Sequence, residues 1–201
     1  MIQVFNCEQG TREWLDCRLG IPTASRFKDV LAKGEGKTRR RYMLDLMGER
    51  ITGEPTESFS NAHMERGKAM EDEARDLYTF MTDADPERVG FVRNGDKGCS
   101  PDSLIGLNGG LEIKTKLPAL QLECLLADKV PSEHVAQLQG FLWVAEREWV
   151  DFVSYWPRVP LFVKRVYRDE DYIKTLATEV ARFNDEMLSL IEKVQPTKAA
   201  A

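Results

Sequence analysis

The chain has 201 residues, 42% of them hydrophobic and 30% charged, which is the composition of an ordinary globular protein. A chain of that length suits one domain and can bury a sizeable core without stabilising disulfides or metal ions. No apolar run reaches the roughly 18–20 residues that cross a bilayer, and the N-terminus lacks the basic and apolar stretches of a signal peptide. We therefore expect a single cytoplasmic domain over residues 1–201 that does not associate with membranes.

The formal net charge of -5 is unevenly distributed. Residues 26–41 carry seven basic and two acidic side chains, whereas 65–87 and 169–192 together carry fifteen acidic and five basic ones. An acidic total disfavours nucleic-acid binding, which depends on Lys and Arg at phosphates. The basic stretch, with Lys37 and Arg39, nevertheless offers a local path for DNA.

Helical and strand patterns alternate along the chain. Helices are expected over about 11–20, 23–31, 38–52, 61–82, 118–128, 133–147 and 169–194, the last followed by a short flexible tail over 195–201. Strands are expected at 88–93, 103–106, 111–115, 149–156 and 161–167. This order predicts a mixed α/β domain.

The last predicted helix carries an apolar seam with alternating spacings of three and four residues. Such a seam packs against a neighbouring surface. Packing on the chain's own sheet is the commoner arrangement, and a contact between subunits is the alternative. The seam consists of Ile173, Leu176, Val180, Phe183, Met187, Leu190 and Val194.

One acidic residue lies on the inward face predicted for the helix at 61–82. That face includes Gly67, Met70, Ala74, Tyr78 and Met81, and Glu71 is its carboxylate. A lone buried charge is costly. Glu71 is therefore expected to pair with an Arg or Lys, to be protonated or to bind a cation.

The cysteines and histidines do not predict a zinc site. The four cysteines show no C-x-x-C spacing, and the chain has only two histidines. Free thiols are the expected state.

The chemistry is concentrated in Ser100-Pro101-Asp102 and Leu111-Glu112-Ile113-Lys114. Alternation along a strand puts Glu112 and Lys114 on one face and Ile113 on the other. A hairpin turn at 108–110 can bring Asp102 beside them. Two carboxylates with a backbone oxygen form a site for Mg²⁺ or Mn²⁺. A solvent-exposed ion pair on a strand is the alternative for Glu-x-Lys alone.

These residues resemble the PD-(D/E)XK nuclease signature, and the flanking sequence is similar to the lambda exonuclease-type alkaline exonucleases, the YqaJ-type viral recombinases. The similarity extends over nearly the whole chain, with five motifs in the family's order. It implies a restriction-endonuclease-like core, a central mixed β-sheet flanked by helices. The motifs are W-x3-R-LG-x2-TAS at 14–25, Gly67-Lys68 through Glu71 with Ala74, Cys99-Ser100-Pro101-Asp102, Leu111-Glu112-Ile113-Lys114, and Ala136–Gln139 with Leu142–Val144.

The resemblance implies a role for each matching residue around a two-metal Mg²⁺ site, at which Mn²⁺ would substitute. Asp102, Glu112 and the backbone carbonyl of Ile113 match the metal ligands, and Lys114 matches the catalytic lysine. Glu71 supports the second metal or its waters. Gln137 matches a glutamine near the active site.

Arg18, Ser25 and Ser100 match residues that hold the 5′-phosphate of the degraded strand. An Arg fork and a hydroxyl near a helix start suit a phosphate. The alternative is a structural set, with a capping hydroxyl and a surface cation. Trp14 is expected either to stack near the DNA or to lie in the core.

The implied function is a Mg²⁺-dependent 5′–3′ exonuclease that degrades linear duplex DNA with 5′-phosphate ends to mononucleotides, leaving 3′ single-stranded tails. The resemblance further implies a homotrimeric ring and a single-strand annealing protein as partner. An endonuclease on the same scaffold and a non-catalytic DNA-end binder are the alternatives.

Overall fold

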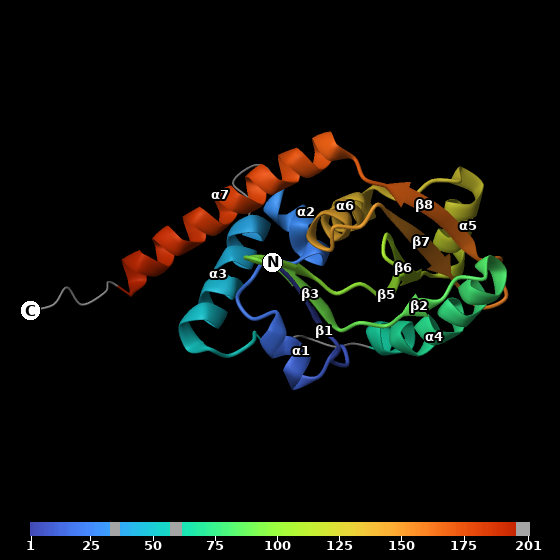
Figure 1. The fold of residues 1–201 in the computed structure, drawn as a ribbon, viewed down its shortest axis with the longest axis horizontal. Coiled ribbons are helices and arrows are strands. Elements are labelled where there is room, and N and C mark those ends of the chain that lie inside the picture. Colours follow the sequence, from blue (N-terminus) through green and yellow to red (C-terminus); the bar gives the residue numbers. More distant parts are fainter. Residues whose placement is uncertain (33–36, 57–61, 196–201) are drawn as a thin grey trace, which may run out of the picture.

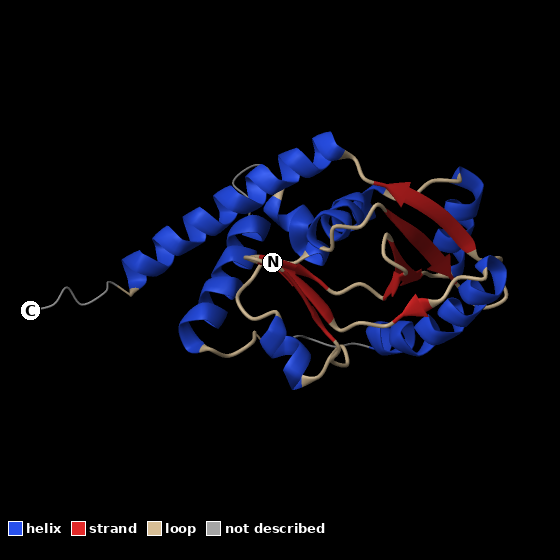
Figure 2. Cartoon of the chain, viewed as in Figure 1, coloured by secondary structure: helices blue, strands red, loops and turns tan. Residues whose placement is uncertain are grey.

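The computed structural model describes residues 1–32, 37–56 and 62–195, with the backbone only at 62–66, 68 and 69. A mixed five-stranded sheet is flanked by helices, as the resemblance implied (Figure 1). Figure 2 shows the sheet strands enclosed between helical layers. Part of the basic stretch, 33–36, and most of the expected tail, 196–201, lie outside the described residues.

The main sheet has the strand that carries Glu-x-Lys at its centre. This strand, β6, is antiparallel to β5 and parallel to β7. Neighbours on both sides and helices on both faces bury most of its side chains. The strand order is β2 (Pro86–Glu87), β5 (Ser103–Ile105), β6 (Gly109–Thr115), β7 (Trp149–Tyr155) and β8 (Phe162–Tyr167).

Helix α4 (Ala62–Thr82) covers one face of β6. Ala74 and Tyr78 of α4 pack into a cluster with Leu111 and Ile113 of β6. Gly67 lies so close to the strand end that a Cβ there would be 3.0 Å from Thr115 Oγ1. The glycine therefore permits the close approach of helix and strand.

Helix α6 (Val135–Val144) meets β6 on the opposite face. Leu138, Phe141 and Leu142 are buried in the larger core, and a Cβ at Gly110 of β6 would clash with the Phe141 ring. The short helix η2 (Ser132–His134) leads into α6, and α5 (Pro118–Ala127) follows β6. Alternating side chains of β6 thus face α4 and α6 in turn.

A second, three-stranded antiparallel sheet lies on the N-terminal side of the molecule. It consists of β1 (Ile2–Phe5), β3 (Phe91–Asn94) and β4 (Lys97–Cys99) in the order β1-β3-β4. The sequence predicted β3 but not β1, β4 or the two-residue β2, because such short strands carry too little alternation. Between β1 and α4 the chain forms the helices α1 (Arg12–Cys17), η1 (Ala24–Arg26), α2 (Phe27–Val30) and α3 (Lys37–Thr52).

The long C-terminal helix α7 (Glu170–Val194) begins after Asp169, whose side chain accepts the Tyr172 N–H. Its seam from Ile173 to Met187 is buried within the same chain. The expectation of packing on the sheet is wrong, because the helix packs mainly against α2, α3 and α6 (Figure 1). At its far end Val194 is exposed.

All four cysteines are free thiols, as predicted. None of the described helices is both long enough and apolar enough to span a membrane.

Candidate active site

The hairpin of β5 and β6 brings Asp102 to the Glu-x-Lys strand, as expected. Ser103 pairs with Leu111 across the two strands, and the Asp102 carboxylate accepts the Ile113 N–H at 2.5 Å. Asp102 is therefore held against the backbone of the residue between Glu112 and Lys114.

Glu112 and Lys114 share one face of β6. Lys114 Nζ and Gln137 Nε2 each lie 2.5 Å from Glu112 Oε1. Only 4% of the Glu112 side chain is exposed. The alternative of a solvent-exposed ion pair is therefore wrong, and Gln137 joins the site from α6.

The carboxylates repel one another in a buried setting. Burial and the charges of Glu112 and Glu71 raise the pKa of Asp102 well above its usual range. Burial alone would lower the pKa of Lys114, but the charges of Glu112 and Asp102 raise it to about 12. Lys114 is therefore a cation at neutral pH, and a divalent cation would relieve the repulsion between the acids.

Glu71 is engaged by an arginine on its own helix. Its Oε1 lies 2.5 Å from Nη2 of Arg75, one turn later on α4. This is the paired state that the sequence allowed for an inward carboxylate. Arg75 lies on the same inward face and is more deeply buried than Glu71. Met81, also expected to face inward, is exposed instead.

The oxygen donors suit a magnesium ion. Asp102 and Glu112 would supply carboxylates and Ile113 its carbonyl, which are hard ligands of the type that Mg²⁺ and Mn²⁺ prefer. In the described part of the chain no three Asp, Glu, His or Cys side chains converge as a cluster. Mg²⁺ tolerates such a small protein set because it keeps several of its waters.

A bound metal ion would lower the pKa of a water and neutralise phosphodiester charge. The chain's own groups do the rest. The Lys114 ammonium can donate to the attacking water or to a phosphate oxygen, and Gln137 holds the Glu112 carboxylate in place. This arrangement is suited to hydrolysis of a phosphodiester bond.

A second group of predicted residues lies at the junction of α1 and the loop before β5. Trp14 Nε1 donates to Ser100 Oγ at 2.9 Å and to the Gly90 carbonyl at 3.1 Å. The Arg18 guanidinium stacks on the Trp14 ring, 4.0 Å from its centroid. Trp14 is half-buried, and it links Arg18 to Ser100. Ser100 in turn lies two residues before Asp102.

Ser25 belongs to the same region. An isolated bridge pairs Thr23 with Gly98, and Ser25 Oγ lies 3.4 Å from Thr23 Oγ1. Thr23 occupies the N-cap of η1 without a capping hydrogen bond from its side chain, and Ser25 is exposed. Burial lowers the pKa of Arg18, which is not a freely solvated surface cation.

A scan against family models matched residues 13–148 to the YqaJ-like viral recombinase domain. The chain belongs to this family. The structure of LHK-Exo in complex with dAMP is 36% identical, with a TM-score of 0.86, over 92% of this chain and 97% of that one. A second structure of this alkaline exonuclease from Laribacter hongkongensis is 34% identical, with a TM-score of 0.85 and the same coverage.

A phage-related exonuclease from Haemophilus somnus 129PT shares only the fold, at 13% identity and a TM-score of 0.65 over 87% of this chain and 96% of that one. A search of curated proteins found no match. As a YqaJ-family member, the chain has a PD-(D/E)XK-like fold and is a deoxyribonuclease of the lambda exonuclease type. Nucleases of this family act on DNA and are typically metal-dependent.

The two remaining predicted DNA contacts differ in their surroundings. Lys37 is exposed at the start of α3. Arg39 Nη1 lies 2.7 Å from Glu186 of α7, and its guanidinium is 5.2 Å from the Phe183 ring. To contact DNA, Arg39 would have to leave or share the Glu186 carboxylate.

Sequence reasoning did not single out two arginines that lie beside the predicted site residues. Arg75 touches Glu71, and the i, i+4 spacing of the two on one helix was the available signal. Arg26, next to Ser25, stacks over Tyr42 at 4.3 Å and pairs with Asp29. Nothing in the local sequence distinguished Arg26 from the other cations of the basic stretch.

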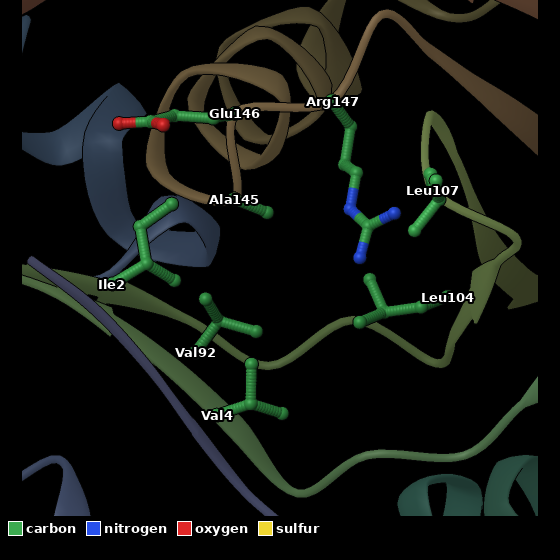
Figure 3. A pocket seen from close by; sticks show the side chains of 8 residues that line it. All are labelled: Ile2, Val4, Val92, Leu104, Leu107, Ala145, Glu146 and Arg147. Atoms are coloured by element: carbon green, nitrogen blue, oxygen red, sulfur yellow. The ribbon is translucent and has the colours of Figure 1, made fainter.

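A separate cavity of about 230 Å³ lies between the three-stranded sheet and the turn after α6 (Figure 3). Mainly apolar side chains line it together with Glu146 and Arg147, and Arg147 Nη1 donates to the Gly106 carbonyl at 2.7 Å. It contains none of the predicted catalytic or phosphate-binding residues. The cavity is therefore distinct from the acidic site.

Proposed function

We propose that this YqaJ-family protein is a Mg²⁺-dependent 5′–3′ exonuclease. It degrades the 5′-ended strand of linear duplex DNA to mononucleotides and leaves 3′ single-stranded tails for recombination by strand annealing. Mn²⁺ substitutes for Mg²⁺, and Asp102, Glu112 and Ile113 hold the first of two metal ions. Glu71 serves the second ion or its waters.

The observation that carries the proposal is the link between the phosphate-binding candidates and the acidic site. Ser100 bonds to Trp14, Trp14 supports Arg18, and Asp102 follows Ser100 by two residues. A 5′-phosphate bound by Arg18, Ser25 and Ser100 would therefore lie next to the hydrolytic centre. Such a site favours a free strand end over an internal phosphodiester.

A ligand bound by a relative agrees with this proposal. LHK-Exo was crystallised in complex with dAMP, a deoxynucleoside 5′-monophosphate. Release of such mononucleotides by the present chain would follow if each hydrolysis step leaves a new 5′-phosphate in the same pocket.

The decisive assay compares linear and covalently closed circular duplexes, each with Mg²⁺ and with a chelator. We expect Mg²⁺-dependent mononucleotide release from linear DNA, faster from 5′-phosphate than from 5′-hydroxyl ends, and no cutting of the circle. Rapid cutting of the circle would instead identify an endonuclease. End binding without any nucleotide release would identify a non-catalytic binder.

We further propose that the protein forms a homotrimeric ring and acts together with a single-strand annealing protein. Both would act on DNA in the cytoplasm. A ring requires a heterologous interface whose rotation closes after three subunits. Light scattering of the purified chain would give three times its mass of 22.9 kDa. A monomeric mass would rule out the ring.

A further inference from the structure

Arg75 is a buried cation whose contacts reach beyond its own helix. Only 7% of its side chain is exposed. Its Nε donates to Ser103 Oγ at 3.0 Å, and its Nη1 lies 2.9 Å from Asp72. Its Nη2 donates to Glu71 at 2.5 Å and to the Asp102 carbonyl at 3.3 Å. One guanidinium thus joins α4 to the hairpin.

The contacts of Arg75 fix the backbone of Asp102. The Asp102 carbonyl accepts from Arg75 and also from Ser103 Oγ, at 2.6 Å. The Asp102 carboxylate is bound separately by the Ile113 N–H. Asp102 is therefore held at both its carbonyl and its carboxylate, and Arg75 provides the hold that comes from α4.

We propose that Arg75 is a positioning residue of the metal site, which sets the Glu71 carboxylate relative to Asp102. The inference rests on the proposed Mg²⁺ dependence. The Glu71 carboxylate and the Asp102 backbone carbonyl accept from the same guanidinium nitrogen, so a movement of α4 along the sheet would be transmitted to both residues. Arg75 itself touches neither substrate nor reacting atoms in this role.

An arginine is suited to this position, whereas a lysine is not. The guanidinium presents five N–H donors in a rigid plane, which lets it serve four acceptors at once. A lysine would keep the charge beside Glu71 but would lose the fixed fork. Groups that orient metal ligands typically change metal affinity or activity about 10- to 100-fold when they are removed.

The chain offers a matched control on the same acidic neighbour. Arg88 also pairs with Asp72, but it is 60% exposed and has no described contact with Glu71 or Asp102. The Arg88→Gln variant therefore removes an arginine near α4 without touching the proposed link.

The experiment measures Mn²⁺ binding to the metal-free protein by calorimetry, without DNA. The Mg²⁺ concentration for half-maximal nuclease activity and the urea midpoint are measured alongside. For Arg75→Gln we expect the Mn²⁺ affinity to fall by about 10-fold or more. The Mg²⁺ concentration for half-maximal activity should rise by a similar factor. Arg75→Lys should recover part of the loss, and Arg88→Gln should match the wild type.

The outcomes separate the two proposals. A wild-type protein that binds no Mn²⁺ and needs no Mg²⁺ contradicts the proposed function itself. Wild-type binding that is unchanged in folded Arg75→Gln overturns only the role of Arg75. If Arg75→Gln does not fold, Arg75→Lys and Ser103→Ala decide, and wild-type Mn²⁺ affinity in both overturns the role.

Discussion

Gln137 on α6 donates a hydrogen bond from Nε2 to Oε1 of Glu112 on β6, at 2.5 Å. The same carboxylate oxygen lies 2.5 Å from the ammonium of Lys114. Glu112 is buried, and burying a charge is costly. When no metal is bound, these two donors are the main interactions that offset this cost. The contact also ties the position of α6 to that of the central strand.

Replacing Gln137 with Ala should lower nucleotide release about 10- to 100-fold, because the Glu112 carboxylate loses the donor that orients it. Single-turnover kinetics on a linear duplex at saturating Mg²⁺ would measure the effect. Gln139→Ala is the matched control. Gln139 bonds to the Tyr167 carbonyl and the Asp169 N–H, away from the acids, so its loss should lower stability and spare the rate.

Replacing Lys114 with Ala should reduce Mg²⁺-dependent hydrolysis about 100- to 1,000-fold, as expected when one donor to developing charge is removed. Binding to DNA ends should persist, and a fluorescence-anisotropy titration without metal would show it. Lys116, two residues later, pairs with Glu133 at 3.3 Å and serves as the control. Nucleotide release at the wild-type rate by Lys114→Ala would disprove the proposed chemistry.

Replacing Arg18 with Ala should remove the preference for 5′-phosphorylated ends. A charged hydrogen bond contributes about 1.5–3 kcal/mol, so we expect a drop of about 10- to 100-fold on phosphorylated ends and little change on hydroxyl ends. Arg12, at the start of the helix α1 that Arg18 follows, pairs with Asp16 and Glu54 at the surface and provides the comparison. Equal losses on both kinds of end would argue for a purely structural Arg18.

His134 should make the fold sensitive to mild acid. Burial, followed by the charges of Lys116 and Lys114, lowers its pKa from 6.5 to about 4. Between these two values the unfolded chain binds the extra proton and the folded chain does not. The contribution of neutral His134 is therefore complete above pH 6.5 and is lost as the pH falls toward about 4.

The test compares the urea midpoints of the wild type and His134→Phe from pH 7.5 down to pH 4 (about one-unit steps suffice). The ring centroids of His134 and Phe152 are 5.2 Å apart, so a phenyl ring should fit in place of the imidazole. The variant should lose less stability on acidification than the wild type. Parallel curves would show that His134 does not titrate in this window.

The net charge of -5 includes the acids of the candidate active site. Asp102 interacts electrostatically with Glu71 and with Glu112, and all three acids interact with Lys114. Within the proposed function they face metal ions rather than phosphates. An acidic total is therefore compatible with a DNA substrate, because positive charge is needed only where the DNA backbone passes.

The sequence by itself determined the local chemistry of the hairpin. Asp102, Glu112 and Lys114 come together because a short turn reverses the chain and strand alternation sets the faces, and both are short-range effects. The helical periodicity of 61–82 likewise placed Glu71 inward. Residues within a few positions of one another dictate such features, so they could be predicted.

Only the tertiary structure decided which contacts join the distant groups of the site. Gln137 reaches Glu112 across 25 residues, and Trp14 reaches Ser100 across 86. Arg75 was readable as a partner of Glu71, but its bond to the Asp102 carbonyl depends on how α4 lies on the sheet. Long-range hydrogen bonds follow from the packing of whole helices and strands, which no local pattern of residues contains.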